Sequence, residues 1–162
     1  AKDIDIDNNY PNDSDDKINE FADNFITIGA LNYEYGNKVV ATFSNFGKIN
    51  VDVFAPGVKI YATGPNNEYK MLQGTSMAAP NVAGVAALIR SYYPKLSAKQ
   101  VKHILMDSGV AINTDVIVGG KSKDVRSFTA LSKSGKIVNA YNALKMAEEV
   151  SKQPTLEKKI KT

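Results

Sequence analysis

The sequence predicts an α/β domain, and three observations favour this class. Residues 25–31 are short, rich in β-branched side chains and apolar on both faces, which is typical of a strand in a sheet covered on both sides. Residues 76–93 form a long stretch that is apolar nearly all round, and such a helix belongs in a core. Residues 97–108 carry the signals of a second, amphipathic helix. The chain has 162 residues, so we expect one domain with a core of its own, over residues 1–150.

Four further apolar segments are predicted to be strands. Residues 39–43 and 51–55 are short, and each is closed by a turn-forming sequence. Residues 58–63 and 69–72 flank a Gly-Pro-Asn-Asn turn, which predicts a hairpin that leads into the long apolar helix. Within that helix, we expect Gly84 and the alanines to let a neighbouring sheet approach closely.

The second helix has clear end signals. Ser97 and Gln100 have the spacing of a capping box, and Leu96 with Val101 fits a hydrophobic staple. Gly109 is expected to stop this helix.

The last part of the domain is less regular. Residues 110–134 are predicted to form a polar loop region with short strands, and the sequence does not indicate their function. Asn139 is a good N-cap for a final helix, whose apolar stripe consists of Ala140, Ala143, Leu144 and Ala147. At the chain ends we expect a polar surface loop over residues 1–24 and a charged tail or linker over residues 151–162.

Composition excludes several classes of function. The formal net charge of +3 is too small to indicate nucleic-acid binding, and the absence of cysteine excludes disulfides and thiolate sites. No apolar run approaches the roughly 20 residues of a membrane span. The acidic N-terminus has the wrong sign for a signal peptide. The chain has a single histidine, His103.

The acidic alternation at Asp3, Asp5 and Asp7 invites a calcium interpretation. It fails the EF-hand pattern, because the position of the sharp turn is Asn8 rather than glycine and the final bidentate position is Ser14 rather than glutamate. A solvated loop is the favoured interpretation, and a calcium site of another type stays open.

Ser76 is the candidate reactive residue, at the mouth of the long apolar helix. Such a serine is either an ordinary N-cap, whose hydroxyl accepts from a free backbone N–H, or a nucleophile at the positive end of a helix. Pro80 lies near the start of this helix and deprives the Ser76 carbonyl of its usual donor, which indicates an irregular helix mouth.

Residues 74–84 (GTSMAAPNVAG) resemble the active-serine signature of subtilisin-like serine proteases. Residues 43–47, 53–57 and 137–140 resemble further blocks of that family, in the same order, so the resemblance spans about residues 26–150. Asn81 departs from the pattern, because many members carry histidine there, and we interpret it as variation outside the chemistry.

The resemblance implies the C-terminal part of a doubly wound, mostly parallel sheet flanked by helices. It implies that Ser76 is the nucleophile, that the Ser76 N–H and the Thr75 hydroxyl stabilise the oxyanion, and that the parent protein hydrolyses peptide or protein substrates through an acyl-enzyme. No cofactor is implied. Calcium is common in the family, without ligands that can be named here. A secreted or cell-envelope location is also implied, although the chain carries no signal for it.

The family order is aspartate, histidine, then serine, and no block for the first two is present. His103 does not replace the missing base, because antiparallel helices would leave it about 16 Å along the axis from Ser76. We therefore expect the isolated chain to be inactive, and to bind an upstream half of the same domain or to self-associate.

Two alternatives to a protease stay open. The first is a non-catalytic interaction or scaffold module on the same fold. The second is an α/β hydrolase with a different serine site, ranked last because the Gly-x-Ser-x-Gly elbow is missing.

Overall fold

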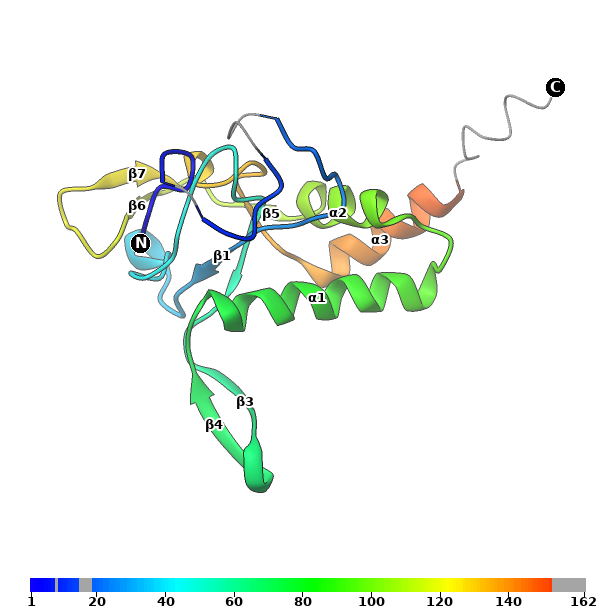
Figure 1. Ribbon diagram of the computed structural model, residues 1–162, viewed down its shortest axis with the longest axis horizontal. Helices are drawn as coiled ribbons and strands as arrows, with labels where there is room; N and C mark the ends of the chain where they lie inside the picture. The colour runs from blue at the N-terminus through cyan, green and yellow to red at the C-terminus, as the bar shows by residue number, and fades with distance from the viewer. Residues whose placement is uncertain (8, 15–18, 153–162) are drawn as a thin grey trace.

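The computed structural model describes residues 1–7, 9–14 and 19–152 (Figure 1). Their main elements run in the order β1 (Ile28–Leu31), β2 (Val53–Pro56), β3 (Ile60–Gly64), β4 (Glu68–Leu72), α1 (Thr75–Tyr92), α2 (Ala98–Asp107), β5 (Val110–Ala111), β6 (Asp115–Ile117), β7 (Val125–Ser127), β8 (Lys136–Ile137) and α3 (Ala140–Lys152).

The central sheet has the order β1-β2-β8-β5. β1, β2 and β8 are parallel, with Ile28 opposite Val53 and Phe54 opposite Ile137, whereas β5 is antiparallel to β8. β3 with β4, and β6 with β7, form separate two-stranded hairpins. The protein is therefore an α/β domain with a mostly parallel sheet flanked by three helices, as the sequence predicts.

The two faces of β2 carry two separate cores, because successive side chains of a strand point to opposite sides. Val53 and Ala55 pack with buried residues from all three helices. Phe54, on the other face, packs with residues around β6 and with Phe128, whose ring centroid lies 5.2 Å away. The close approach of the Phe54 ring favours glycine at position 29, because an added Cβ would overlap this ring.

The helix caps are confirmed. The Ser97 hydroxyl accepts from the Gln100 N–H and the Gln100 side chain accepts from the Ser97 N–H, which completes the capping box of α2. Leu96 and Val101, the predicted staple, are both buried. The Asn139 side chain accepts from the Asn142 N–H at 2.9 Å and caps α3.

Ser97→Ala is expected to lower the free energy of unfolding by about 1 kcal/mol, because it leaves an N–H of the first turn of α2 without its acceptor. Urea unfolding measures this loss. Ser151→Ala is the matched control, since that exposed hydroxyl only donates to the Glu148 carbonyl at the end of α3. An equal effect of the two substitutions would contradict the capping role.

The prediction of a strand over residues 39–43 is wrong. Val40 forms only an isolated bridge with Leu31, and the backbone otherwise follows β1 through single hydrogen bonds such as Ala41 N–H to the Ala30 carbonyl. Val39, Val40 and Ala41 are nevertheless buried, and Phe43 is half-buried. The hydrophobic pattern therefore indicated buried residues, but it did not show that they pair with β1 at a single bridge only.

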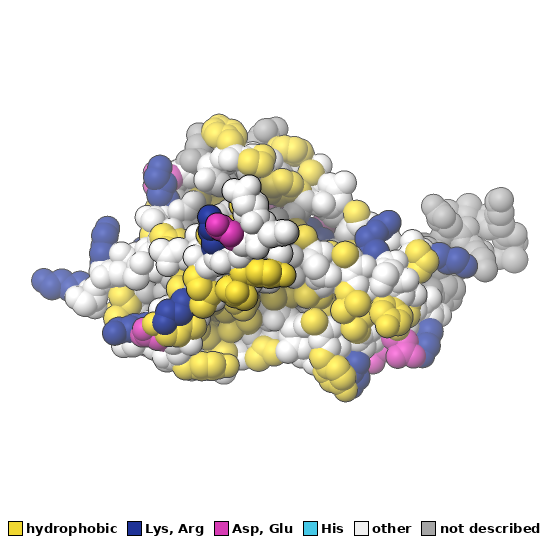
Figure 2. Space-filling model, turned by 90° about the horizontal axis from the view of Figure 1, so that it is seen from below, with side chains coloured by type: hydrophobic (Ala, Val, Ile, Leu, Met, Phe, Trp, Pro, Cys, Tyr) yellow, Lys and Arg dark blue, Asp and Glu magenta, His cyan; other side chains and the backbone are white. Residues whose placement is uncertain are grey.

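Helix α1 has the predicted position but not the predicted surroundings. Its buried residues are only Ala78, Val82 and Ile89. On the remaining surface, Leu88 is 38% exposed and Tyr92 is 69% exposed, and an added Cβ at Gly84 would have no neighbour within 4 Å. Figure 2, which looks onto the side of the molecule where α1 lies, shows hydrophobic side chains spread over it. The expected close packing at Gly84 is absent from the described residues.

The chain ends also differ from expectation. The described part of residues 1–24 has no regular helix or strand, as predicted, but it is not simply solvated. Ile4, Asp13 and Ser14 are buried, and the Ile4 N–H donates to the Phe46 carbonyl. At the other end, α3 continues to Lys152, so the first two residues of the expected tail are helical. The rest of that tail lies outside the described residues.

Candidate functional site

The site begins where the β3–β4 hairpin delivers the chain to α1 (Figure 1). Gly74 is the N-cap of α1 with φ 145° and ψ 162°, a backbone conformation that side chains other than glycine rarely adopt. Its N–H donates to the Gly57 carbonyl at 2.8 Å. An added Cβ on Gly74 would lie 2.8 Å from the Ser76 Oγ, and one on Gly57 would lie 2.9 Å from the Gly74 carbonyl oxygen. Two glycines thus hold the turn before Ser76 against the end of β2.

Ser76 is not the N-cap, so the capping interpretation is wrong. Gly74 occupies that position without a side-chain cap bond, and Ser76 is the second residue of the helix. The Ser76 side chain is exposed and Thr75 is half-buried. The Ser76 hydroxyl therefore lies at the N-terminus of α1 and does not cap the helix.

The backbone around Ser76 can bind negative charge. The N–H groups of Met77 and Ala78 donate to the Gly74 carbonyl, whereas those of Thr75 and Ser76 have no backbone acceptor among the described residues. They lie at the positive end of an 18-residue helix, where unpaired N–H groups and the helix dipole favour an anion. A substrate oxyanion beside Ser76 would meet both effects.

Asn81 braces this turn, a role that sequence reasoning missed. Pro80 lies inside α1 and has no N–H to offer the Ser76 carbonyl. The Asn81 side-chain amide donates to the Met77 carbonyl at 3.2 Å and to the Pro56 carbonyl at 3.0 Å. It therefore ties the first turn of α1 to the end of β2. The only sequence signal was a side-chain donor directly after the proline.

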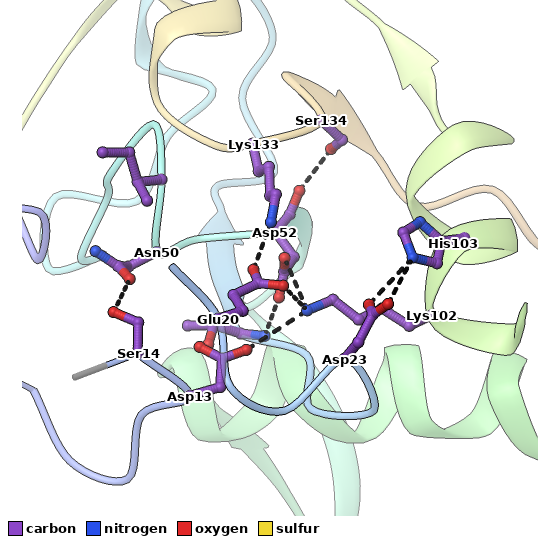
Figure 3. Close-up of polar contacts among 12 residues, drawn as sticks. Asp13, Ser14, Glu20, Asp23, Asn50, Asp52, Lys102, His103, Lys133 and Ser134 are labelled. Carbon is purple, nitrogen blue, oxygen red and sulfur yellow. Dashed lines mark hydrogen bonds and ion pairs between the residues drawn. The ribbon is translucent and has the colours of Figure 1, made fainter. Parts of the chain in front are cut away.

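The single histidine of the sequence pairs with a carboxylate rather than with Ser76. His103 is the only histidine of the chain and lies on α2. Its Nε2 is 3.1 Å from Asp23 Oδ1, and its side chain is 49% exposed. Figure 3 shows the ring turned toward Asp23. The prediction that His103 is a surface residue of this helix is confirmed.

The acidic N-terminal residues use their carboxylates for protein contacts. Asp5 accepts from the N–H groups of Ile49 and Asn50, and Asp3 pairs with Arg126 at 3.2 Å. Within the described ranges, no group of three acidic or histidine side chains is arranged to hold a metal ion. None of the described helices combines the length and hydropathy that crossing a membrane requires.

The fold and this turn define an α/β protein in which a helix N-terminus presents an exposed serine at the end of a strand of the parallel sheet. A sequence model of the subtilase family matches residues 4–141, and the chain belongs to this family of serine proteases. It is 45% identical to Subtilisin DY of Bacillus licheniformis over 97 residues, which cover 60% of this chain and 34% of the relative. It is 36% identical to M-protease of Shouchella clausii over 96 residues, covering 59% of this chain and 24% of the relative.

Solved structures agree with the family. The A-subunit of the AB5 toxin from E. coli has a TM-score of 0.58 at 25% identity, over 75% of this chain and 37% of that chain. The prenylagaramide maturation protease PagA has a TM-score of 0.57 at 27% identity, over 78% of this chain and 44% of that chain. The chain thus matches only 34% of the length of Subtilisin DY.

Proposed function

We propose that Ser76 is the nucleophile of a subtilisin-like serine endopeptidase whose remaining catalytic residues lie outside these 162 residues. The observation that carries the proposal is the position of Ser76, exposed in the first turn of α1 beside two N–H groups without backbone acceptors. Membership of the subtilase family supports the same chemistry.

In this proposal the Ser76 Oγ attacks the carbonyl carbon of a peptide bond. The hydroxyl proton passes to a histidine supplied by the upstream part of the domain, and then to the leaving amine. The Ser76 N–H and the Thr75 hydroxyl donate to the oxyanion that forms on the substrate. Water then hydrolyses the acyl-enzyme and restores the serine.

Three observations support an upstream partner segment. The single histidine is paired with Asp23, the chain matches 34% of the length of Subtilisin DY, and α1 leaves an apolar face uncovered by the described residues. We propose that the chain alone is inactive and that this face binds the upstream half, or a second copy when that half is absent. Peptides or proteins are the substrates, and an extracellular location fits the family.

A fluorophosphonate probe tests the proposal, because it labels a serine only when its base and oxyanion hole are assembled. The chain alone is expected to stay unlabelled, and the chain co-expressed with its upstream segment is expected to be labelled at Ser76. Fast, stoichiometric labelling of the chain alone would contradict the need for an upstream base. A monomer at high concentration in sedimentation would contradict self-association.

A scaffold module is the second candidate, favoured by the lack of a base beside Ser76 in the described residues. It predicts no labelling in either sample, together with tight binding of the upstream segment.

A further inference from the structure

A buried cluster of charges lies at the opposite end of β2 from the Ser76 turn (Figure 3). Its centre is the Lys102 ammonium, whose side chain is 3% exposed. The Lys102 Nζ lies 3.0 Å from Glu20 Oε2, 3.5 Å from Asp13 Oδ2 and 3.6 Å from Asp52 Oδ1. The Lys133 Nζ lies 2.6 Å from the other carboxylate oxygen of Glu20.

The five side chains come from four separate parts of the chain. Asp13 and Glu20 belong to the N-terminal segment, which here means the described part of residues 1–24. Asp52 directly precedes β2, Lys102 lies on α2, and Lys133 lies in the loop before β8. The cluster is thus a buried place where the N-terminal segment is fastened to the α/β body by charge.

Asp52 is held in the α/β body by hydrogen bonds to Thr27 and Ser134. Its Oδ2 accepts from the Thr27 N–H at 2.7 Å, its own N–H donates to the Thr27 carbonyl, and the Ser134 hydroxyl donates to its carbonyl oxygen. Its Oδ1 points into the cluster and has no hydrogen-bond donor among the described residues. One oxygen of a fully buried carboxylate is therefore left with only the ion pair to Lys102.

Among the described residues, the cluster holds one more acid than its cations can neutralise. Fully ionised, its three carboxylates face two ammonium groups from the described part of the chain, Lys102 and Lys133, which leaves one negative charge in excess. On the exposed side of α2, Lys99 and His103 both pair with Asp23, and at its end Lys136 donates to the Asp107 carbonyl. Because an uncompensated buried charge is costly, a shared site of this kind favours uptake of one proton.

Asp52 is the member that takes the proton. Burial raises the pKa of Asp52 to about 6, against the opposing effects of the Thr27 N–H and of Lys102. Burial also acts on Glu20, but the hydrogen bonds from Lys133 and Lys102 outweigh it and lower the pKa of Glu20. Burial would lower the pKa of Lys102, yet the Asp52 carboxylate and the Glu20 hydrogen bond raise it, so Lys102 stays charged.

We propose that Asp13, Glu20, Asp52, Lys102 and Lys133 form a proton-controlled latch that fastens the N-terminal segment to the α/β body. With Asp52 protonated the cluster is neutral and closed. When Asp52 ionises, its carboxylate repels Asp13 and Glu20, which anchor the segment within this cluster. Separation of the segment relieves this repulsion and admits water to Asp52.

The sign of the pH effect follows from the raised pKa of Asp52, about 6 against an ordinary 3.8. The stabilisation is complete below the ordinary value and is lost as the pH rises through about 6. Glu20 acts in the opposite sense, because its lowered pKa makes its stabilisation disappear only in more acidic solution. The latch is therefore tightest in mildly acidic solution.

Amide hydrogen exchange of the full chain at pH 5 and pH 7.5, corrected for intrinsic rates, tests the latch. In the wild-type chain, protection of amides in the N-terminal segment is expected to fall by up to about tenfold at the higher pH, because pH 5 lies about one unit below the pKa of Asp52, about 6. Amides of β1 and β2 are expected to change far less. Asp52→Asn should weaken the pH dependence of the segment, and the difference between the two proteins isolates the contribution of Asp52, because any effect of the His103–Asp23 pair is common to both. Glu68→Gln, in an exposed surface pair with Lys70, is the control and should leave the pH dependence intact.

A carbon-13 NMR titration of the Asp52 carboxyl group gives a second measurement that needs no substitution. Its midpoint is expected near pH 6, and Asp13→Asn should move it downward by removing one repelling carboxylate. A midpoint below pH 5 would overturn the proposal. So would a pH dependence of the segment that is equally large in Asp52→Asn, or an equal loss of protection throughout the molecule.

Discussion

Ser76→Ala in the complete protease is expected to lower kcat for peptide hydrolysis by about a millionfold, the magnitude known for loss of the serine in subtilisin. The substitution removes the atom that forms the acyl-enzyme but leaves the N–H of residue 76 in place, so KM should change little. Thr75→Val, which removes one oxyanion donor, is expected to lower kcat by at most about a hundredfold.

Steady-state kinetics on a chromogenic peptide would measure both effects in the complete protein. Ser91→Ala is the matched control, since this exposed serine lies on the same helix and its hydroxyl only donates to the Leu88 carbonyl. Its activity should equal that of the wild type. Retention of more than a thousandth of the activity by Ser76→Ala would exclude Ser76 as the nucleophile.

Lys102→Met is expected to lower the free energy of unfolding by about 3–5 kcal/mol at neutral pH, because it leaves buried carboxylates without their central cation. The Lys102 side chain is 3% exposed and lies within 3.6 Å of three carboxylates. Adding Asp52→Asn should recover part of the loss, since the double variant buries one negative charge fewer.

Urea unfolding at pH 7.5 measures these free energies. Lys70→Met is the control, because Lys70 pairs with Glu68 on the surface at 2.9 Å, and its loss should be within about 0.5 kcal/mol. If Lys102→Met were as mild as Lys70→Met, the buried cluster would have no role in holding the chain together.

Features set by neighbours in the sequence could be predicted. The capping box at Ser97 and Gln100, the cap at Asn139 and the β3–β4 hairpin all appear where their residues indicate them. Each depends on contacts within a few residues, so the local sequence contains the whole signal. Residues 39–43 were misjudged because their apolar pattern reports burial, whereas a strand also needs a partner of matching length.

The functional site was predictable in part. The motif around Ser76 indicated the turn at the mouth of α1, because close backbone approach requires the glycines that precede it. The role of Ser76 as nucleophile stays a prediction. The brace from Asn81 to Pro56 was not predictable, since it joins a helix to a strand that ends 25 residues earlier. The buried Lys102 was missed as well, because a lysine on an amphipathic helix normally faces water.

The sequence by itself determined the α/β class, the long apolar helix, the caps and the family, because these depend on patterns within short segments. Only the tertiary structure showed that α1 keeps one apolar face uncovered by the described residues, and that three acids and two lysines meet at one end of β2. Such arrangements join residues as distant as Asp13 and Lys102. Long-range packing alone decides which charges are buried together, and burial decides what those charges can do.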